Sequence, residues 1–365
     1  MTENSLLRFG FVAACEEYSP TELVRFGIMS EERGLDAVWA SDHFHPWWHT
    51  GGHGVFAWNL LSAVGALTRR VIVGTSVTCP LFRYSPAIVA QSFATLSCLY
   101  PGRVFLGVGT GEALNEVPCG FDWPSTHKER IERLKEALII IRLLWSRDFV
   151  TFKGKFYRVT KANIYDKPPI QIPIHIATTG VKGAELAGAL GDALMSLPLE
   201  DTSIFISKLF PALERAARKY NRDPETIEKS LLVHVGFRED NYDAALRSLL
   251  KWRTTLLPVF FDLGVYDPRY IEMHGDRVST EVIEKYFLVA DSEETIIRFM
   301  ERYIKIGFTH IAAAASGDVE GFIKIFGENV SPYLKETYGG KAEDWKPYRG
   351  FYPKESLEKI LGEMI

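Results

Sequence analysis

The chain has 365 residues, 47% of them hydrophobic and 24% charged, which is enough apolar sequence for one large buried core. The formal net charge at pH 7 is -4 and no long basic run is present, so a nucleic-acid partner is not expected. Four widely spaced cysteines without a CxxC pair or zinc-type spacing predict free thiols in a reducing, cytoplasmic compartment.

In chain order, short apolar strands alternate with longer amphipathic segments. The strands lack alternating polarity, which is typical of strands that are buried on both faces. Eight strands are predicted from apolar runs bounded by polar residues, Gly or Pro, at residues 8–13, 37–40, 71–76, 104–109, 172–178, 193–197, 231–237 and 310–314. Helices that begin at Ser-Pro or end at Gly in several cases are predicted at 20–33, 86–99, 128–145, 202–220 and 293–306.

This order of about eight strand and helix pairs predicts an α/β fold, the (β/α)8 barrel. A doubly wound open sheet gives the same alternation with fewer strands, so the number of strands favours the barrel. Residues 1–340 are expected to form this single domain. Residues 341–365 are expected to form a C-terminal extension that packs on it.

Two segments interrupt the alternation. Residues 149–160 alternate apolar and polar side chains around Gly154, which predicts an inserted β-hairpin. About 70 residues separate the last two predicted strands, which is too many for one repeat. We expect the excess, at about 238–290, to form a lid or substrate wall over the barrel.

Polar side chains follow the first two predicted strands, whose ends share one rim in a closed barrel. His43 follows the second strand beside Asp42, and an imidazole there can act as a general base near neutral pH. The alternative is a histidine that only holds its loop. Trp47 could form an aromatic wall beside a flat ligand or pack under the loop. Glu16, after the first strand, could serve the site or cap a helix.

The fourth strand runs into a glycine-rich segment, residues 107–116. Glycines here would let the backbone approach a flat ring or a phosphate closely, but the spacing is not the dinucleotide fingerprint. Glu112 in this segment is either a site carboxylate or a solvated group at a helix start. Small polar residues at 74–80 end the third strand on the same rim and could hold a strained peptide against a ligand.

Familiar catalytic motifs are missing from the sequence. No HExxH, Walker A, GxSxG or paired metal-ligand pattern occurs, so no metal site is predicted. A rim with a histidine, tryptophans, carboxylates and glycine-rich backbone suits proton abstraction beside a flat bound cofactor.

At these residues the sequence resembles the deazaflavin (coenzyme F420)-dependent dehydrogenases of the bacterial-luciferase-like superfamily. Within it, the sequence is most similar to the branch of the glucose-6-phosphate dehydrogenases and secondary alcohol dehydrogenases. The resemblance covers the chain to about residue 335. It is carried by residues 41–47, 74–77, 82–91 and, most specifically, 99–116.

The resemblance implies a (β/α)8 barrel of the luciferase-like type, with insertions on the C-terminal rim and coenzyme F420 in the rim pocket. A hydride would pass between C5 of the deazaflavin and a carbinol carbon of the substrate. The resemblance implies that His43 takes the hydroxyl proton and that Trp47 steadies the developing charge. It implies Glu112 as the proton donor near N1 of the ring and Glu16 as a further active-site carboxylate.

The resemblance also places a set of residues against the cofactor, namely Asp42, Ser76, Val77, Thr110, Gly111, Asn115, Thr179 and Gly180. At Ser76–Val77 it implies a cis peptide bond behind the deazaflavin ring. Such bonds are rare without proline. The presence of this bond is therefore a specific expectation for the structure.

The substrate is expected to be uncharged. In the sugar-phosphate branch, basic side chains after the sixth strand and in the late insertion hold the phosphate. The matching stretches here, 196–200, 260–264 and 284–287, are mainly apolar or acidic, so the resemblance favours a secondary alcohol. Trp252 and Tyr286 would line its smaller pocket.

The sequence also allows other functions. A sugar-6-phosphate dehydrogenase is the alternative in the same family, with Lys208, Lys251 and Lys285 as possible phosphate donors or as solvated lysines. A flavin monooxygenase and a non-catalytic barrel are further alternatives. Neither is expected to carry the set of His43, Trp47 and Glu112.

The expected partners are a small hydroxylated substrate and, by the resemblance, a second copy of the chain in a homodimer. Residues 1–5 lack the charged and apolar pattern of a secretory leader, and no apolar run is long enough to span a bilayer. A membrane is therefore not an expected partner.

Overall fold

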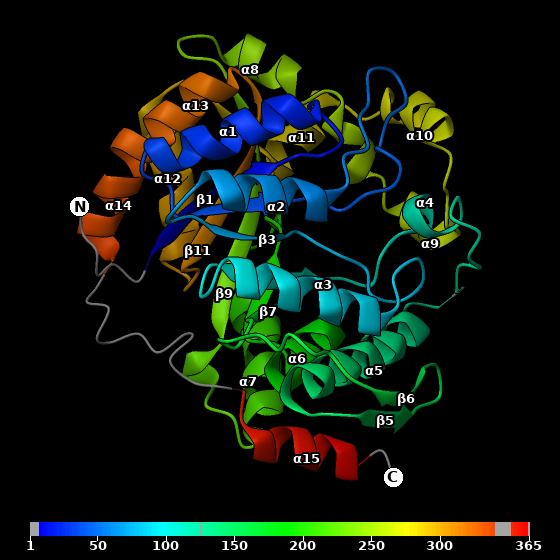
Figure 1. The fold of residues 1–365 in the computed structure, drawn as a ribbon. Helices are drawn as coiled ribbons and strands as arrows, with labels where there is room; N and C mark the ends of the chain where they lie inside the picture. Colours follow the sequence, from blue (N-terminus) through cyan, green and yellow to red (C-terminus); the bar gives the residue numbers. More distant parts are fainter. Residues whose placement is uncertain (1–6, 125, 340–351, 364–365) are drawn as a thin grey trace.

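Eight parallel strands close into a barrel that is surrounded by helices (Figure 1). The computed structural model describes residues 7–124, 126–339 and 352–363. Strand β1 pairs with β2 on one side and β11 on the other, and the pairing of β8 with β9 closes the ring. The barrel strands are β1 (Arg8–Ala13), β2 (Ala37–Ala40), β3 (Ile72–Thr75), β4 (Val104–Val108), β7 (Ile174–Ala177), β8 (Ala193–Ser196), β9 (Glu228–Phe237) and β11 (His310–Gly317). The predicted (β/α)8 barrel is confirmed, and the open sheet is excluded.

Strand β9 begins at Glu228, three residues before the predicted start. Its first residues are polar, and Glu228 and Ser230 face the barrel interior, so the apolar run in the sequence begins later than the strand. Glu228 Oε2 lies 3.8 Å from His175 Nε2 and 3.7 Å from His310 Nδ1. Burial opposes ionisation of Glu228, but Arg8 and the two histidines outweigh it and lower its pKa to about 2. A ninth strand, β10 (Leu288–Ala290), was not predicted and pairs with the end of β9.

Four helices that cover the barrel have no predicted counterpart. They are α2 (Ala57–Leu67), α6 (Val181–Leu190), α13 (Val319–Ile325) and α14 (Ser331–Tyr338). The predicted helix at 202–220 is divided into a π-helical turn, η1 (Phe205–Leu209), and α7 (Phe210–Lys219). The other covering helices are α1 (Pro20–Glu32), α3 (Pro86–Leu99), α5 (His127–Ser146) and α12 (Glu293–Ile304), and the turn η4 (Phe326–Val330) precedes α14. In the described part of the chain, no helix combines the length and apolar character needed to cross a bilayer.

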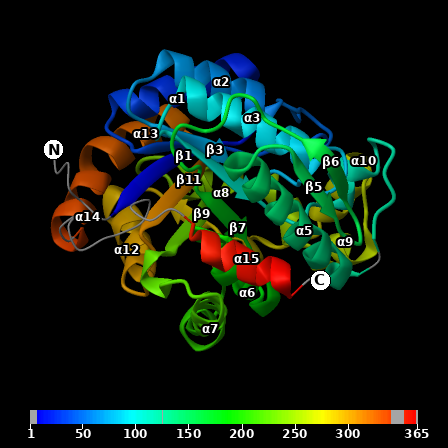
Figure 2. The same ribbon diagram turned by 60° about the horizontal axis from the view of Figure 1, so that its bottom comes forward.

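A two-stranded hairpin lies beside α5 (Figure 2). It consists of the antiparallel strands β5 (Val150–Lys153) and β6 (Arg158–Ala162). The Glu136 carboxylate on α5 accepts backbone N–H groups of Lys155, Phe156 and Tyr157 in the connecting turn. One buried side chain therefore fixes the turn to the barrel.

The long segment between β9 and β11 forms helical turns over the C-terminal rim. They are α8 (Tyr242–Ser248), η3 (Trp252–Leu256), α9 (Pro258–Leu263), α10 (Pro268–Gly275) and α11 (Thr280–Tyr286). We call residues 238–290 the rim insertion. It shares a separate apolar cluster with Trp47 and Trp48 from the loop after β2 and with Leu114 after β4. Helix α4 (Ala113–Glu116) lies beside it (Figure 1).

The C-terminal helix α15 (Lys354–Gly362) lies across the other end of the barrel, in front of β7 and β9 in Figure 2. Just before it, the Tyr352 ring packs against the guanidinium groups of Arg142 and Arg222, 3.8 and 4.7 Å from the ring centroid. The Tyr352 hydroxyl donates to the Ala189 carbonyl oxygen at 2.6 Å. Residues 340–351 of the predicted extension lie outside the described residues.

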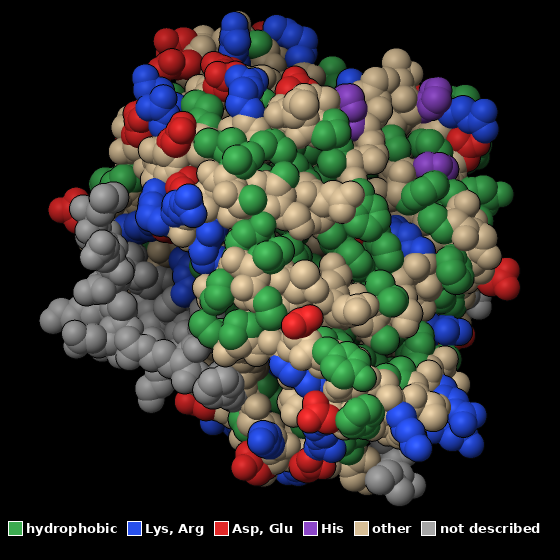
Figure 3. Space-filling view, viewed as in Figure 1, with side chains coloured by type: hydrophobic (Ala, Val, Ile, Leu, Met, Phe, Trp, Pro, Cys, Tyr) green, Lys and Arg blue, Asp and Glu red, His purple; other side chains and the backbone are tan. Residues whose placement is uncertain are grey.

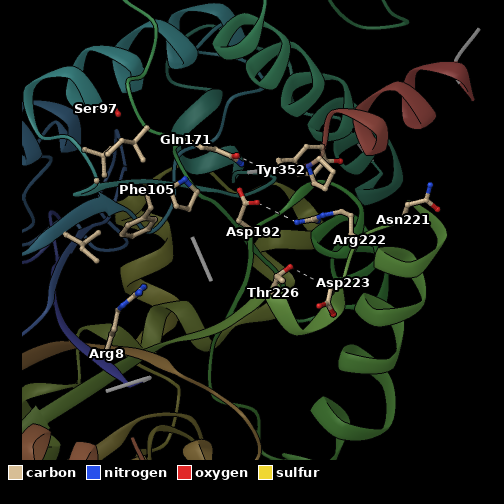
Figure 4. Close-up of a pocket in the computed structure, with 16 residues that line it drawn as sticks. Arg8, Ser97, Phe105, Gln171, Asp192, Asn221, Arg222, Asp223, Thr226 and Tyr352 are labelled. Atoms are coloured by element: carbon tan, nitrogen blue, oxygen red, sulfur yellow. Dashed lines mark hydrogen bonds and ion pairs between the residues drawn. The ribbon is translucent and has the colours of Figure 1, made fainter. Parts of the chain in front are cut away.

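A cavity of about 440 Å³ opens at this amino-terminal end of the strands (Figure 4). Its polar wall is internally paired, because Asp192 contacts Arg222 at 3.5 Å and Arg142 at 2.8 Å. Catalytic sites of (β/α)8 enzymes lie at the opposite, carboxyl ends of the strands. The size of this cavity is therefore no guide to the active site.

Candidate active site

Glu16 and His43 meet at the C-terminal rim because they follow the neighbouring parallel strands β1 and β2. His43 Nδ1 lies 2.8 Å from Glu16 Oε1, and Ser41 Oγ donates to Glu16 Oε2 at 2.6 Å. Glu16 is buried, whereas 13% of the His43 side chain is exposed. The carboxylate thus lies behind the imidazole, and the ring faces the open side of the rim.

The electrostatics of this pair favour its charged form. Burial by itself would raise the pKa of Glu16, but the His43 charge and two side-chain hydrogen bonds lower it. Burial would lower the pKa of His43, but Glu16, with a smaller contribution from Glu112, raises it. With Nδ1 engaged by Glu16, Nε2 is the ring nitrogen left to exchange a proton with a substrate.

Trp47 packs against the same imidazole. The two ring centroids are 5.6 Å apart with an edge-to-face angle of 64°. On its other side Trp47 contacts Phe261 of the rim insertion at 5.1 Å. Trp48 packs instead against Trp252, at 5.0 Å. Trp47 therefore borders the site, and Trp48 packs against the rim insertion.

Glu112 and Asn115 connect the loop after β4 to the loop after β2. Asn115 Nδ2 donates to Glu112 Oε2 at 3.1 Å, and its Oδ1 accepts the backbone N–H of Phe44 at 2.8 Å. Because Asn115 is buried and the charge of Glu112 acts on His43, the two loops border one site. The structure thus brings together all four predicted catalytic residues.

A buried charged network that the sequence did not predict lies next to this site. Arg83 Nη2 donates to Asp42 Oδ1 at 2.9 Å, and Nη1 lies 3.2 Å from Glu116 Oε1. Thr78 Oγ1 donates to the other Asp42 oxygen at 2.6 Å. Burial raises the pKa of Glu116 to about 6, against the effect of Arg83. We call Asp42, Arg83 and Glu116 the arginine network.

This network gives Asp42 a structural role beside the cofactor contact that the resemblance implies for it. Both of its carboxylate oxygens already accept hydrogen bonds from protein side chains. Arg83 and Glu116 lie within the segments that carry the resemblance, but nothing in the sequence indicates that Arg83 pairs with both Asp42 and Glu116. Only the spacing of the strand ends in three dimensions shows it.

The Ser76–Val77 peptide bond is cis, as predicted. The glycines of the segment after β4 have a different use from the one expected. A Cβ at Gly107 would overlap the Thr75 carbonyl oxygen, and one at Gly109 would lie 2.7 Å from Val77 Cγ2. The prediction that these two glycines admit a ligand is wrong in this respect, because the atoms they admit belong to the end of β3.

The other predicted cofactor residues differ in the space beside them, and a Cβ at Gly111 would overlap Cys79 Sγ. Ser76 Oγ is buried and has no hydrogen-bond partner in the described part of the chain. Gly111 has a positive φ of 73°, which glycine adopts without strain. Thr110 is half-buried beside it, and Thr179 is exposed after β7. At Gly180, the N-cap of α6, a Cβ would meet no atom within 4 Å.

The predicted substrate-pocket residues belong to the rim insertion. Trp252 is buried and its Nε1 donates to Glu17 Oε2 at 2.8 Å. Ser316 Oγ at the end of β11 donates to the same oxygen at 2.8 Å. Burial raises the pKa of Glu17 to about 7. Tyr286 packs at the edge of the apolar cluster, and no described contact joins it to His43.

Replacing Glu16 with glutamine should alter the pH profile of any reaction that uses His43. Removal of the carboxylate charge lowers the pKa of His43 toward its value in a buried apolar site. A reaction in which neutral His43 accepts a proton should then persist to lower pH. The reverse reaction, in which protonated His43 donates a proton, should fall off at lower pH. The maximal rate should fall at least about tenfold, because the imidazolium loses its counter-charge. The profile of kcat/KM against pH measures both effects, and an unmoved acidic limb would exclude coupling of the pair.

Together the fold and the rim residues define a (β/α)8 barrel with a histidine–carboxylate pair at its C-terminal rim. The family model described as luciferase-like monooxygenase matches residues 7–310. The chain belongs to this family.

Curated relatives and solved structures give a finer comparison. The chain is similar to the F420-dependent glucose-6-phosphate dehydrogenase of Microbacterium testaceum (strain StLB037), with 40% identity over 333 residues, 91% of this chain and 98% of the relative. The enzyme of the same name from Nakamurella multipartita is 38% identical over 334 residues, again 91% and 98%. A solved F420-dependent secondary alcohol dehydrogenase in complex with an F420–acetone adduct has a TM-score of 0.86 and 38% identity, and the match covers 90% of this chain and 99% of that one. The resemblance found in the sequence is confirmed.

Proposed function

We propose that this chain is a coenzyme F420-dependent dehydrogenase that acts on the CH–OH group of a small hydroxylated substrate. The observation that carries the proposal is the Glu16–His43 pair at the rim, in a chain whose relatives are named as F420-dependent dehydrogenases. When bound, coenzyme F420 supplies the carbon that takes or returns the hydride.

The chain itself handles the proton. His43 Nε2 accepts the substrate hydroxyl proton during oxidation and returns it during reduction, since Nδ1 is held by Glu16. Glu16 stabilises the imidazolium that forms. The edge-on Trp47 ring fixes the imidazole and keeps water from it. Glu112, held by Asn115, supplies a carboxyl group on the opposite loop for protonation of the cofactor.

The residues present fit coenzyme F420. The unpartnered Ser76 Oγ and the adjoining Val77 form a wall for a flat ring. Thr110, Gly111 and Asn115 border it from the loop after β4, and Asp42 supports this wall through the arginine network. The open amino-terminal end of α6, at Thr179 and Gly180, suits an anionic group because backbone N–H groups point out of a helix start.

An uncharged secondary alcohol is the substrate class that we favour. A phosphate dianion needs convergent Arg or Lys donors. Lys285 is paired with Glu200, with 3.0 Å between Nζ and Oε1. Arg83 is taken up by the arginine network, and Lys251 lies over the Trp48 ring at 5.9 Å. The negative charge of Glu16, which is buried beside His43, would also oppose a phosphate.

Glucose 6-phosphate is the second candidate because several relatives at 37–40% identity carry that name. The test is to incubate the purified protein with oxidised coenzyme F420 and a panel of isopropanol, other secondary alcohols and glucose 6-phosphate. Turnover is followed as loss of the absorbance of the oxidised cofactor. Turnover of alcohols but not of the sugar phosphate supports the proposal. Turnover of glucose 6-phosphate alone would contradict the alcohol substrate, and failure to bind the cofactor would contradict the proposed function.

We also propose that the enzyme is a homodimer formed through α2 and α3. Neither helix contains an Asp, Glu, Lys or Arg residue, and Figure 3 shows a band of hydrophobic and uncharged side chains over this face. The large exposed apolar side chains on or next to these helices are Phe56, Leu67, Ile88 and Leu99. An uncharged apolar patch of this kind marks a protein interface, and it is complementary to a second copy of itself.

The dimer is tested by replacing Ile88, a 52% exposed residue in the first turn of α3, with aspartate. Light scattering after size-exclusion chromatography should change from a dimer to a monomer mass. The matched control is Ile206→Asp, at a 57% exposed position in η1, which packs on α6 and α7, and it should keep the dimer mass. A wild-type monomer, or an unaffected Ile88→Asp dimer, would contradict this interface.

We also propose that the enzyme acts in the cytoplasm. All four cysteines are free thiols, which supports a reducing compartment.

A further inference from the structure

His234 is a polar side chain inside the barrel that the proton chemistry does not use. Strand side chains alternate between the two faces. On β9, Ser230 faces the interior, where its Oγ lies 3.4 Å from His175 Nδ1, and Leu232 belongs to the interior cluster with Trp39. His234 therefore faces the interior as well, one level closer to the C-terminal rim.

The imidazole of His234 is held by the rim insertion. Its ring centroid lies 4.3 Å from that of Trp252 and 4.9 Å from that of Phe287. Trp252 is itself fixed, because its indole N–H is donated to Glu17. The His234 ring thus packs against two aromatic side chains of the rim insertion, one of which is hydrogen-bonded in place.

One nitrogen of this ring has no use within the protein. His234 Nδ1 is buried and has no hydrogen-bond partner in the described residues. A buried polar atom without a partner is unfavourable. A ligand that binds beside His234 would supply the missing hydrogen bond, which its aromatic neighbours cannot.

The charges around His234 determine whether the group that supplies this hydrogen bond is charged or uncharged. Burial lowers the pKa of His234 to about 4, while the charge of Glu16 acts in the opposite direction. The groups that face this part of the pocket are Glu16 after β1, Glu17 held by Ser316 of β11, and Lys251 of the insertion, which acts on Glu17. At neutral pH the imidazole is uncharged, so it offers one donor and one acceptor and no attraction for an anion.

We propose that His234 is a specificity-determining residue that hydrogen-bonds a second, uncharged oxygen of the substrate. This inference rests on the proposed function and narrows the substrate to a secondary alcohol that carries another hydroxyl or carbonyl oxygen. His234 lies on β9, and only β11 separates β9 from β1, which is followed by Glu16 and paired with the strand before His43. The charge of Glu16 acts on both histidines. A short polyol or hydroxyketone can therefore place its carbinol at His43 and its second oxygen at His234. A site built to hydrogen-bond a substrate hydroxyl discriminates strongly against the analogue that lacks it.

The test compares 2-butanol with 2,3-butanediol, which differ by one hydroxyl group. The wild-type enzyme should prefer the diol in kcat/KM. His234→Leu should lower the diol-to-butanol preference at least about tenfold, and His234→Gln, which keeps a donor and an acceptor, should restore part of it. His127→Leu, at an exposed residue at the start of α5, is the control and should keep the wild-type preference.

A second measurement separates this inference from the proposed function. The imidazole ¹⁵N resonances that disappear in His234→Leu should shift when the diol is added to wild-type enzyme with oxidised cofactor. Glucose 6-phosphate should leave them in place. Turnover of alcohols with an unchanged preference in His234→Leu would overturn the inference alone. Absence of alcohol turnover would contradict the proposed alcohol substrate, and the resonances would then still decide whether His234 contacts the diol.

Discussion

Replacing His43 with alanine should lower turnover by about 10²–10⁴-fold, which is the usual contribution of a positioned general base. Coenzyme F420 should still bind, because the cofactor wall is formed by other residues. The loss arises because a hydroxyl oxygen that keeps its proton is a poor partner for hydride departure. Single-turnover absorbance changes measure the rate, and titration of the cofactor measures its dissociation constant.

His45→Ala is the matched control in the same loop. Its Nδ1 contacts only the Tyr266 carbonyl oxygen, at 3.4 Å, among the groups that the structure describes, so activity should change little. Near wild-type turnover in His43→Ala would mean that another group removes the proton. A loss of cofactor binding in the same variant would mean that the imidazole belongs to the cofactor site.

Replacing Arg83 with methionine should lower the free energy of unfolding by about 3–5 kcal/mol, as expected when one partner of a buried ion pair is removed. Asp42 and Glu116 would remain as buried carboxylates, with side-chain exposures of 2% and 0%, without their cation. Methionine keeps most of the side-chain volume, so the loss of charge dominates. Denaturant unfolding at pH 7 measures the difference.

Arg25→Met gives the comparison at the surface. Arg25 pairs with Glu320, and both side chains are more than half exposed. Such pairs contribute about 0–1 kcal/mol. If the two variants lost the same small amount, the arginine network would contribute nothing beyond an ordinary surface pair.

The barrel could be predicted because its strands are buried on both faces and appear as uninterrupted apolar runs. Where a strand carries interior polar residues, as β9 does at Glu228 and Ser230, the prediction began too late. Strand β10 has only three residues, and no periodicity can be read from so short a run. Helix α2 follows the Trp-rich loop without a side-chain cap, so its start carried no signal.

The site was predictable where one residue type at a strand end suggests its chemistry, as with His43, Glu16 and Glu112. Hydrogen bonds and ion pairs between residues of different loops could not be predicted. The link between Arg83 and Glu116 spans two strands and depends on how close the strand ends lie. His234 was read as part of an apolar strand, because alternation reveals an inward histidine only after the strand register is known.

The rim insertion leaves the barrel at the end of β9 and returns as β10, whose residues pair with Val235, Gly236 and Phe237 of β9 itself. Its two ends are therefore one strand spacing apart, about 4.8 Å. Exchange for a segment of another length would then cost little loop-closure entropy. A segment of another length can therefore replace the insertion without a change in the strands β1 and β2 that position Glu16 and His43.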